Sequence, residues 1–213
     1  MITDGLNPLT FLTFLALVFG SGAAALLVVF SLILKRPDAA RVIAQLAAGG
    51  VGAYGALFLI ASLTSTNRVL GPGEEKHICE VDCHLAYSVV GAKTVKTLDG
   101  RTAQGTFYLV TVKVRFDETT ISPHRGMAPL TPNSRYAAIV DGQGRRYEAP
   151  TDALQRQLVP GESYTTDLVF DLPPDASELR LILANHDVET PFIIGHENSF
   201  FHGTTTFRLD RYL

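Results

Sequence analysis

Two long apolar runs near the start of the chain decide its structural class. Residues 11–34 contain no Asp, Glu, Lys, Arg or His, and neither do residues 42–66. A helix needs about 20 predominantly apolar residues to cross the hydrocarbon core of a bilayer. The pattern therefore predicts a membrane anchor within residues 1–66, built from two transmembrane helices at about residues 11–34 and 42–64.

Basic residues between the two runs predict how the helices are oriented. Lys35, Arg36 and Arg41 lie in this short connection, whereas Asp4 is the only charged side chain before the first run. Basic residues beside a transmembrane helix resist translocation and stay in the cytoplasm. A cleaved signal peptide would begin with a basic segment and have a shorter apolar core, so we expect both helices to be retained. Both termini are predicted on the periplasmic side of a bacterial inner membrane.

Beyond residue 67 the apolar positions recur every second residue, which is the period of half-buried strands. The clearest example is residues 110–116, in which Val and Phe alternate with Thr, Lys and Arg. Turn signals such as Asp141-Gly142 and Pro160-Gly161 separate about seven short strands. This order predicts an all-β antiparallel sandwich over residues 77–213, joined to the anchor by a linker at residues 67–76.

Four pieces of sequence carry a resemblance to a known bacterial domain, and they are residues 105–116, 138–147, 158–162 and 168–173. They form a long strand, a hairpin with an Asp-x-x-Gly-x-x-Tyr element, a Pro-Gly turn and a strand that ends at proline. This order resembles the immunoglobulin-like extracellular domain shared by small bacterial lipoproteins and secreted mycobacterial immunoprotective antigens, over about residues 85–210. The resemblance implies an immunoglobulin-like fold and no shared catalytic residues. The chain departs from it in having two membrane spans instead of a lipoprotein signal, and a cysteine segment before the first strand.

Small residues recur at every fourth position in both apolar runs. Such a stripe lets helix backbones approach closely, and van der Waals packing is what draws helices together in lipid. One interpretation is an antiparallel hairpin whose two stripes face each other. The other is docking against the helices of another protein. The residues concerned are Ala16, Gly20 and Ala24 in the first run, and Ala44, Ala48, Gly52 and Ala56 in the second.

The segment from His77 to His84 contains potential metal ligands at His77, Cys79, Cys83 and His84. An oxidising periplasm favours a disulfide between the two cysteines. That bridge requires a turn, because an extended strand would hold Cys79 and Cys83 roughly 13 Å apart. Thiolates combined with imidazoles would instead suit copper or zinc. Covalent haem, whose attachment signature differs by one residue, and a redox-active thiol pair are further alternatives.

A second candidate segment, residues 195–203, precedes the last predicted strand. It has Phe200 where a zincin helix would have its second His. Ser199 and His202 could form a triad with Asp187, but the nucleophile elbow of a hydrolase is missing. A glycine-bounded aromatic loop of this kind is typical of a binding loop at the end of a sandwich. The residues predicted to contact a partner are His196, Asn198, Phe200, Phe201 and His202.

Charge and motifs narrow the function. The chain has 18 Lys plus Arg against 21 Asp plus Glu and no basic stripe, so nucleic acid is not an expected partner. The sequence has no catalytic constellation, and no cofactor is expected. We therefore expect a non-catalytic accessory subunit of a bacterial membrane complex, for example a respiratory or photosynthetic one, whose partners are other subunits and the lipid bilayer. The alternatives are a metal-binding or redox protein that uses the His77–His84 segment, and a free-standing membrane-anchored binding module.

Overall fold

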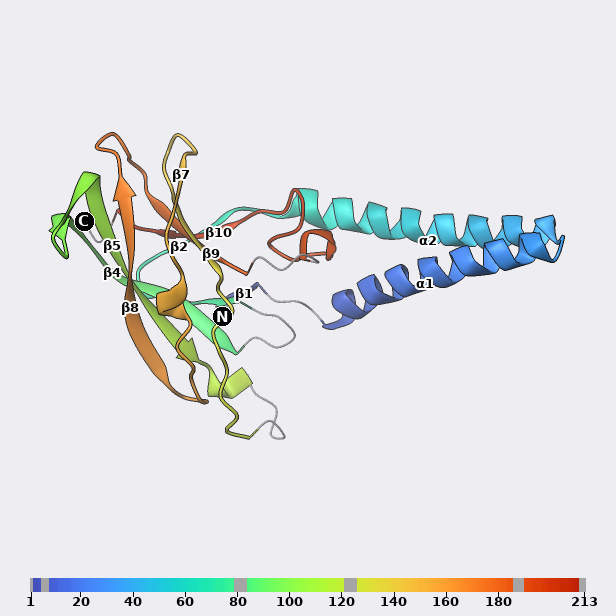
Figure 1. The fold of residues 1–213 in the computed structure, drawn as a ribbon, viewed down its shortest axis with the longest axis horizontal. Coiled ribbons are helices and arrows are strands. Elements are labelled where there is room, and N and C mark those ends of the chain that lie inside the picture. Colours follow the sequence, from blue (N-terminus) through green and yellow to red (C-terminus); the bar gives the residue numbers. More distant parts are fainter. Residues whose placement is uncertain (1, 5–7, 79–83, 121–125, 186–189, 211–213) are drawn as a thin grey trace. The chain divides into compact units, whose positions relative to one another are not determined.

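The computed structural model describes residues 2–4, 8–78, 84–120, 126–185 and 190–210 (Figure 1). The chain forms two compact units. One contains residues 6–66 and 189–203, and the other contains residues 1–5, 67–188 and 204–213. The first is helical and the second is a β-sandwich, so each is described by itself.

The helical unit is an antiparallel pair, with α1 at Pro8–Ile33 and α2 at Pro37–Thr64. The chain reverses at Lys35, which has a φ of 56°. Pro37 then starts α2, where its fixed φ suits the first helical turn. Both helices are long and apolar enough to cross a bilayer, and they match the two predicted spans. Large apolar side chains such as Leu26 and Leu46 are exposed along them.

The sandwich consists of two five-stranded sheets. The first sheet has the order β1-β3-β4-β5-β8 and the second has the order β2-β10-β9-β6-β7. The first sheet contains β1 (Ile2–Asp4), β3 (Lys76–Ile78), β4 (Leu85–Leu98), β5 (Arg101–Phe116) and β8 (Ser163–Leu172). The second contains β2 (Arg68–Leu70), β10 (Thr205–Arg208), β9 (Arg180–Ala184), β6 (Tyr136–Val140) and β7 (Arg146–Glu148). Three short 3-10 helices accompany them: η1 (Glu118–Thr120), η2 (Asp152–Leu154) and η3 (Thr190–Phe192).

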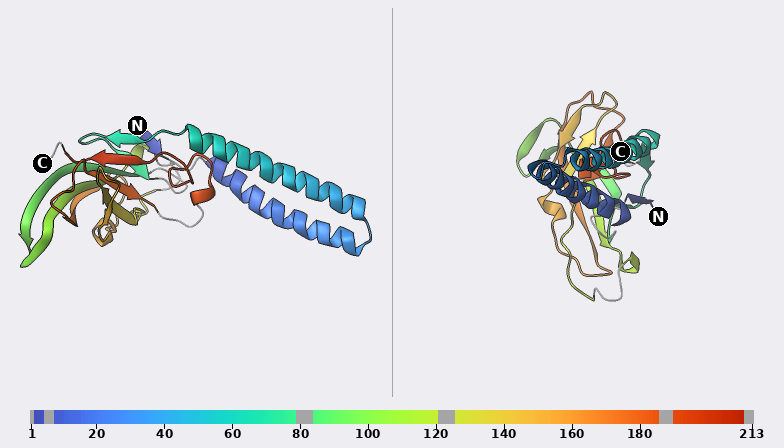
Figure 2. Two further views of the ribbon diagram at one scale, coloured as in Figure 1. Left: turned by 90° about the horizontal axis from the view of Figure 1, so that it is seen from above. Right: turned by 90° about the vertical axis from the view of Figure 1, so that its right-hand side faces the viewer.

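The core follows the alternation of apolar residues along the strands. Val110, Val112, Val114 and Phe116 of β5 are all fully buried, and each such side chain stabilises the fold by roughly 1.5–3 kcal/mol relative to an exposed one. Strand β5 pairs along most of its length with β4, and Figure 2 shows the two as a long curved hairpin. The predicted architecture, two apolar helices followed by an all-β sandwich, is confirmed.

The structure corrects the predicted domain boundaries in two places. Residues 67–76 are not a separate linker, because β2 pairs with β10 and Leu70 is buried in the core. Residues 189–203, which were assigned to the sandwich, belong to the helical unit. In addition, the N-terminal strand β1 pairs in parallel with β3. Hydrophobic period alone cannot reveal these pairings, since β1, β2 and β3 have only three residues each.

Candidate functional site

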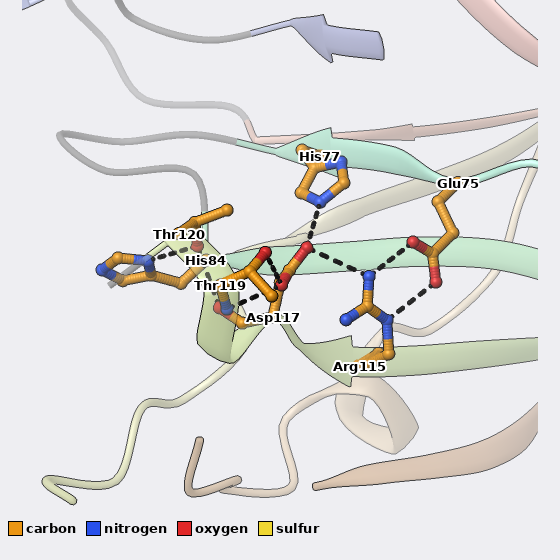
Figure 3. Close-up of polar contacts among 7 residues, drawn as sticks. All are labelled: Glu75, His77, His84, Arg115, Asp117, Thr119 and Thr120. Carbon is orange, nitrogen blue, oxygen red and sulfur yellow. Dashed lines mark hydrogen bonds and ion pairs between the residues drawn. The ribbon is translucent and has the colours of Figure 1, made fainter. Parts of the chain in front are cut away.

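A polar cluster lies where β3, β4 and β5 of the first sheet meet η1, and Figure 3 shows its side chains. We call it the Asp117 cluster. It consists of Glu75, His77, His84, Arg115, Asp117, Thr119 and Thr120.

Strand register brings the members of the Asp117 cluster together. His77 pairs with Ala86, and Ala86 pairs with Arg115, so the three residues form one row across the sheet. Side chains two residues apart on a strand share a face, which places Glu75 beside His77 and Asp117 beside Arg115. The small side chain of Ala86 leaves room for the longer ones on either side. This face is opposite the sandwich core, yet His77 and Asp117 are buried.

Asp117 accepts hydrogen bonds on both carboxylate oxygens. Its Oδ1 accepts from the backbone N (3.0 Å) and Oγ1 (2.6 Å) of Thr119, which caps η1 as short polar residues commonly do. Its Oδ2 lies 3.1 Å from Nη2 of Arg115 and 3.3 Å from Nε2 of His77. Burial alone would raise the pKa of Asp117, but these hydrogen bonds outweigh it and hold the pKa well below its ordinary value.

Arg115 joins two carboxylates. Its Nε and Nη2 donate to the two oxygens of Glu75, at 2.9 and 2.6 Å. Bidentate pairs of this kind are the stronger class of charge-assisted hydrogen bond. The hydrogen bond from Arg115 lowers the pKa of Glu75, although burial opposes it. The same contacts raise the pKa of Arg115, so the group remains an ion triplet at neutral pH.

The two histidines predicted as possible metal ligands contact different residues of the segment from Asp117 to Thr120. His77 faces Asp117, while Nδ1 of His84 lies 2.8 Å from Oγ1 of Thr120. The ring of His84 also stacks on Phe116, with centroids 5.6 Å apart. Cys79 and Cys83 lie outside the described residues. Within the part of the chain that the structure describes, no three His, Cys, Asp or Glu side chains are grouped so that they could hold a metal ion.

Comparison with protein families identifies the domain that contains most of this cluster, all but Glu75 and His77. Residues 80–191, just over half of the chain, match the family described as a domain of unknown function, DUF4352. The chain belongs to the DUF4352 family. The match includes β4 to β9, so it covers the strands on which the resemblance to extracellular immunoglobulin-like domains rests. No curated protein gives a significant match to this DUF4352 chain.

Solved structures similar to the DUF4352 chain include two bacterial proteins. One is MPT63, a secreted protein from Mycobacterium tuberculosis, which is 13% identical with a TM-score of 0.46. The match covers 68% of this chain and 99% of MPT63. The other is the yjhA protein from Bacillus subtilis, also 13% identical, with a TM-score of 0.42. That match covers 68% of this chain and 100% of the yjhA protein.

The small-residue stripes of the DUF4352 chain lie differently on the two helices. Ala16, Gly20 and Ala24 of α1 line a groove of about 290 Å³ between the helices, opposite Ala47 and Gly50 of α2. The α2 stripe of Ala44, Ala48, Gly52 and Ala56 is exposed and is not among the residues that line this groove. The groove thus pairs the α1 stripe with a row of α2 residues that includes Ile43, Ala47 and Gly50, and close packing of the two predicted stripes stays a prediction. A Cβ added at Gly52 would meet nothing within 4 Å.

The predicted partner loop of the DUF4352 chain packs within the helical unit. Its aromatic residues Phe200 and Phe201 are exposed, whereas His196 is buried and its Nδ1 accepts a hydrogen bond from the backbone N of Asn198. His202 Nδ1 lies 2.8 Å from the carbonyl oxygen of Gly203. Asp187, which would complete a triad with Ser199 and His202, lies outside the described residues.

Sequence reasoning missed Glu75, Arg115 and Asp117. Arg115 occupies a polar position of a predicted strand, and Asp117, just after that strand, is a residue type that commonly caps helices. Neither signal indicates that Arg115 contacts Glu75, because the contact joins residues 40 positions apart. Lys76 was also missed. It is fully buried, and its Nζ donates a 2.7 Å hydrogen bond to the carbonyl oxygen of Leu183 in the opposite sheet.

Proposed function

We propose that this DUF4352 protein is a non-catalytic accessory subunit of a bacterial membrane complex, for example a respiratory or photosynthetic one. Its two helices anchor it in the inner membrane, and its sandwich lies on the periplasmic side. The observation that carries the proposal is the exposed stripe of α2, Ala44, Ala48, Gly52 and Ala56, which α1 leaves uncovered. In lipid, such a stripe allows close contact with a helix of another subunit.

The arrangement of the chain supports the proposed topology. Three basic residues occupy the turn between the helices and its immediate vicinity. The segments on either side of the helix pair, β1 and β2, are strands of the same sandwich. A helical hairpin with both of its ends in one domain requires both ends to lie on one side of the membrane. The positive-inside rule then assigns the basic turn to the cytoplasm.

The chemistry of the Asp117 cluster supports a structural role for this part of the domain. Its charges are directed at one another: Arg115 binds both Glu75 and Asp117, and Asp117 also caps η1. General acid or base catalysis uses a group whose pKa is close to the operating pH. The pKa values of Asp117 and Glu75 are instead lowered away from neutrality. The cluster is therefore suited to tying β3, β5 and η1 together.

The proposal is tested by extracting the tagged full chain from its native membrane with a mild detergent. We expect it to comigrate in a constant ratio with other subunits. Gly52→Leu should release it, because the side chain separates the helix backbones. Gly22→Leu is the matched control, since Gly22 of α1 is exposed and lies outside the groove. Migration as a lone chain would instead identify a free-standing binding module. Unchanged comigration of Gly52→Leu would show that the stripe is not the contact.

A further inference from the structure

Residues 190–203, which we call the Phe loop, pack beside the C-terminal half of α2 (Figure 1). Two hydrogen bonds attach the loop at different heights on the helix. The Tyr54 hydroxyl donates to the carbonyl oxygen of Phe192 at 2.8 Å, and the Gly203 backbone N donates to Ser65 Oγ at 2.6 Å. Because an α-helix rises 1.5 Å per residue, these attachment points are separated by roughly 16 Å along α2.

The backbone of the Phe loop forms hydrogen bonds within the loop itself. The backbone N atoms of His196, Ser199, Phe200 and His202 donate to carbonyl oxygens of the loop, over 2.9–3.3 Å. The Ser199 hydroxyl donates to the carbonyl oxygen of Ile193. Non-helical backbone is tolerated at membrane depth only when its polar groups are satisfied by protein or by water in a cavity. These contacts satisfy many of the polar backbone groups of the loop within the protein, without bulk water.

In the Phe loop the aromatic side chains are exposed while polar side chains are buried, which is the reverse of a loop that faces water. Phe192, Phe200 and Phe201 are 53%, 51% and 72% exposed, whereas the polar His196 and Ser199 are only 4% and 5% exposed. Phe201 also has a φ of 66°, a left-handed conformation that costs a residue with a side chain roughly 1–2 kcal/mol. The fold thus accepts backbone strain at the residue whose ring is most exposed.

Exposed apolar side chains of α2 at the same height as the Phe loop indicate what covers these rings. Leu57, Ile60 and Leu63 are 59%, 60% and 70% exposed, and they lie between the two attachment points of the Phe loop. From Arg41 to Leu63 the helix rises roughly 33 Å, close to the 30 Å thickness of a hydrocarbon core. A bilayer that covers the apolar length of α2 therefore extends to the level at which the Phe loop is packed.

We propose that the Phe loop inserts into the periplasmic leaflet, with Phe192, Phe200 and Phe201 among the acyl chains just below the headgroups. The inference rests on the membrane anchor of the proposed function. The polar residues 196–199 remain at headgroup level or inside the protein, as in other interfacial segments. The loop thereby gives the protein a third point of membrane contact, formed by a segment far from the two helices in sequence.

The chain contains no Trp, so a single introduced Trp reports on one position. Three variants of the full chain are reconstituted in phosphatidylcholine vesicles that contain brominated lipids. Phe201→Trp tests the Phe loop and Leu57→Trp tests α2. Met127→Trp is a control in the sandwich, at a residue that is 66% exposed. Bromine on the acyl chain quenches Trp on contact, and acrylamide in the buffer quenches Trp that is exposed to water.

We expect lipid bromines to quench Phe201→Trp and Leu57→Trp, and acrylamide to quench Met127→Trp. Bromine placed near the headgroup end of the acyl chain should quench Phe201→Trp more than bromine placed near the methyl end. If only Leu57→Trp is quenched by lipid while Phe201→Trp is quenched by acrylamide, the anchor stands and the loop proposal is wrong. In that case the exposed rings are left for a protein partner. If lipid fails to quench Leu57→Trp, the membrane anchor itself is wrong.

Discussion

Asp117 is held by a charged contact as well as by hydrogen bonds that a neutral oxygen could also accept. Arg115 and His77 both contact Oδ2, while Thr119 donates twice to Oδ1. An Asn at this position keeps an oxygen that can accept from Thr119, but it loses the charge that attracts Arg115. The loss of stability in this variant should therefore come mainly from the hydrogen bond to Arg115 and less from the cap of η1.

Replacing Asp117 with Asn should lower the free energy of unfolding by about 2 kcal/mol, the usual contribution of hydrogen bonds to a charged group. Urea unfolding of the full chain in detergent, followed by tyrosine fluorescence, measures it. Asp167→Asn is the control, because the Asp167 side chain is 37% exposed and lies 3.9 Å from Lys93. Exposed pairs contribute less than about 1 kcal/mol. Equal effects at the two positions would contradict a special role for Asp117.

The same carboxylate predicts how stability depends on pH. The pKa of Asp117 in the folded protein lies below its ordinary value of 3.8. Its contribution is therefore complete above pH 3.8 and is lost as the pH falls toward the folded-state pKa. Glu75, whose pKa is also lowered, acts in the same direction. We expect the midpoint of urea unfolding to fall in acid for the wild-type chain, and to fall less for Asp117→Asn. Parallel pH profiles would count against this assignment.

Among the elements, the pairing of β5 with β8 depends on a glycine. A Cβ on Gly105 would overlap the carbonyl oxygen of Leu172 and lie 3.0 Å from Cα of Pro173. Nearby, the backbone N atoms of Gln104 and Gly105 donate to the carboxylate of Asp171. The two strands can therefore approach here only because position 105 has no side chain.

Gly105→Ala should destabilise the sandwich by about 2 to 3 kcal/mol, because backbone atoms cannot move aside as a flexible side chain can. Gly91→Ala is the matched control. A Cβ at Gly91 would be 3.7 Å from Oγ1 of Thr111, an ordinary contact. Thermal unfolding monitored by circular dichroism measures both variants. If the two melt at the same temperature, the close approach of β8 does not limit stability.

The connection between β3 and β4 contains both cysteines, and it decides between a structural disulfide and a metal site. Ile78 and Leu85 are paired across antiparallel strands, so the two ends of this connection lie within about 5.5 Å of each other. Cys79 and Cys83 themselves lie outside the described residues, so a bridge between them stays a prediction.

We expect intact unreduced protein to have the mass of a disulfide and to contain no stoichiometric metal. Replacing Cys79 and Cys83 with Ser should cost about 2 kcal/mol, since a short loop removes little entropy from the unfolded chain. Mass spectrometry, metal analysis and urea unfolding measure these three quantities. The metal hypothesis would replace the disulfide if both thiols are free and one equivalent of copper or zinc is lost in the double variant.

At the scale of the whole molecule, the proposed topology places the turn between α1 and α2 in the cytoplasm and the sandwich in the periplasm. Ala39→Cys places a thiol in the first turn of α2, close to Arg36 and Arg41. In intact cells this thiol should not react with an impermeant reagent, and it should react after the membrane is opened. A thiol introduced at Met127 of the sandwich should react before opening. If Ala39→Cys is labelled in intact cells, the predicted topology is wrong and the turn between the helices lies outside the cytoplasm.

The helices and the longer strands could be predicted because each carries its own period along the sequence. The alternation of Val110, Val112 and Val114, for example, specifies a half-buried strand without reference to any neighbour. The Asp117 cluster could not be predicted in this way. His77 and Asp117 are 40 residues apart, and they meet only because Ala86 lies between His77 and Arg115 in the sheet register.

The pairing of β2 with β10 has a consequence for how the protein is made. Arg68 is synthesised directly after α2, but Thr206, which donates to its carbonyl oxygen, comes 138 residues later. Ribosomes add about 5–20 residues per second, so β2 waits on the order of ten seconds for its neighbour. If the sandwich is exported, as the proposed topology requires, the strand is during that interval an unpaired edge on a nascent chain that is still crossing the membrane. We therefore expect periplasmic chaperones to matter more for the yield of this protein than its modest size would suggest.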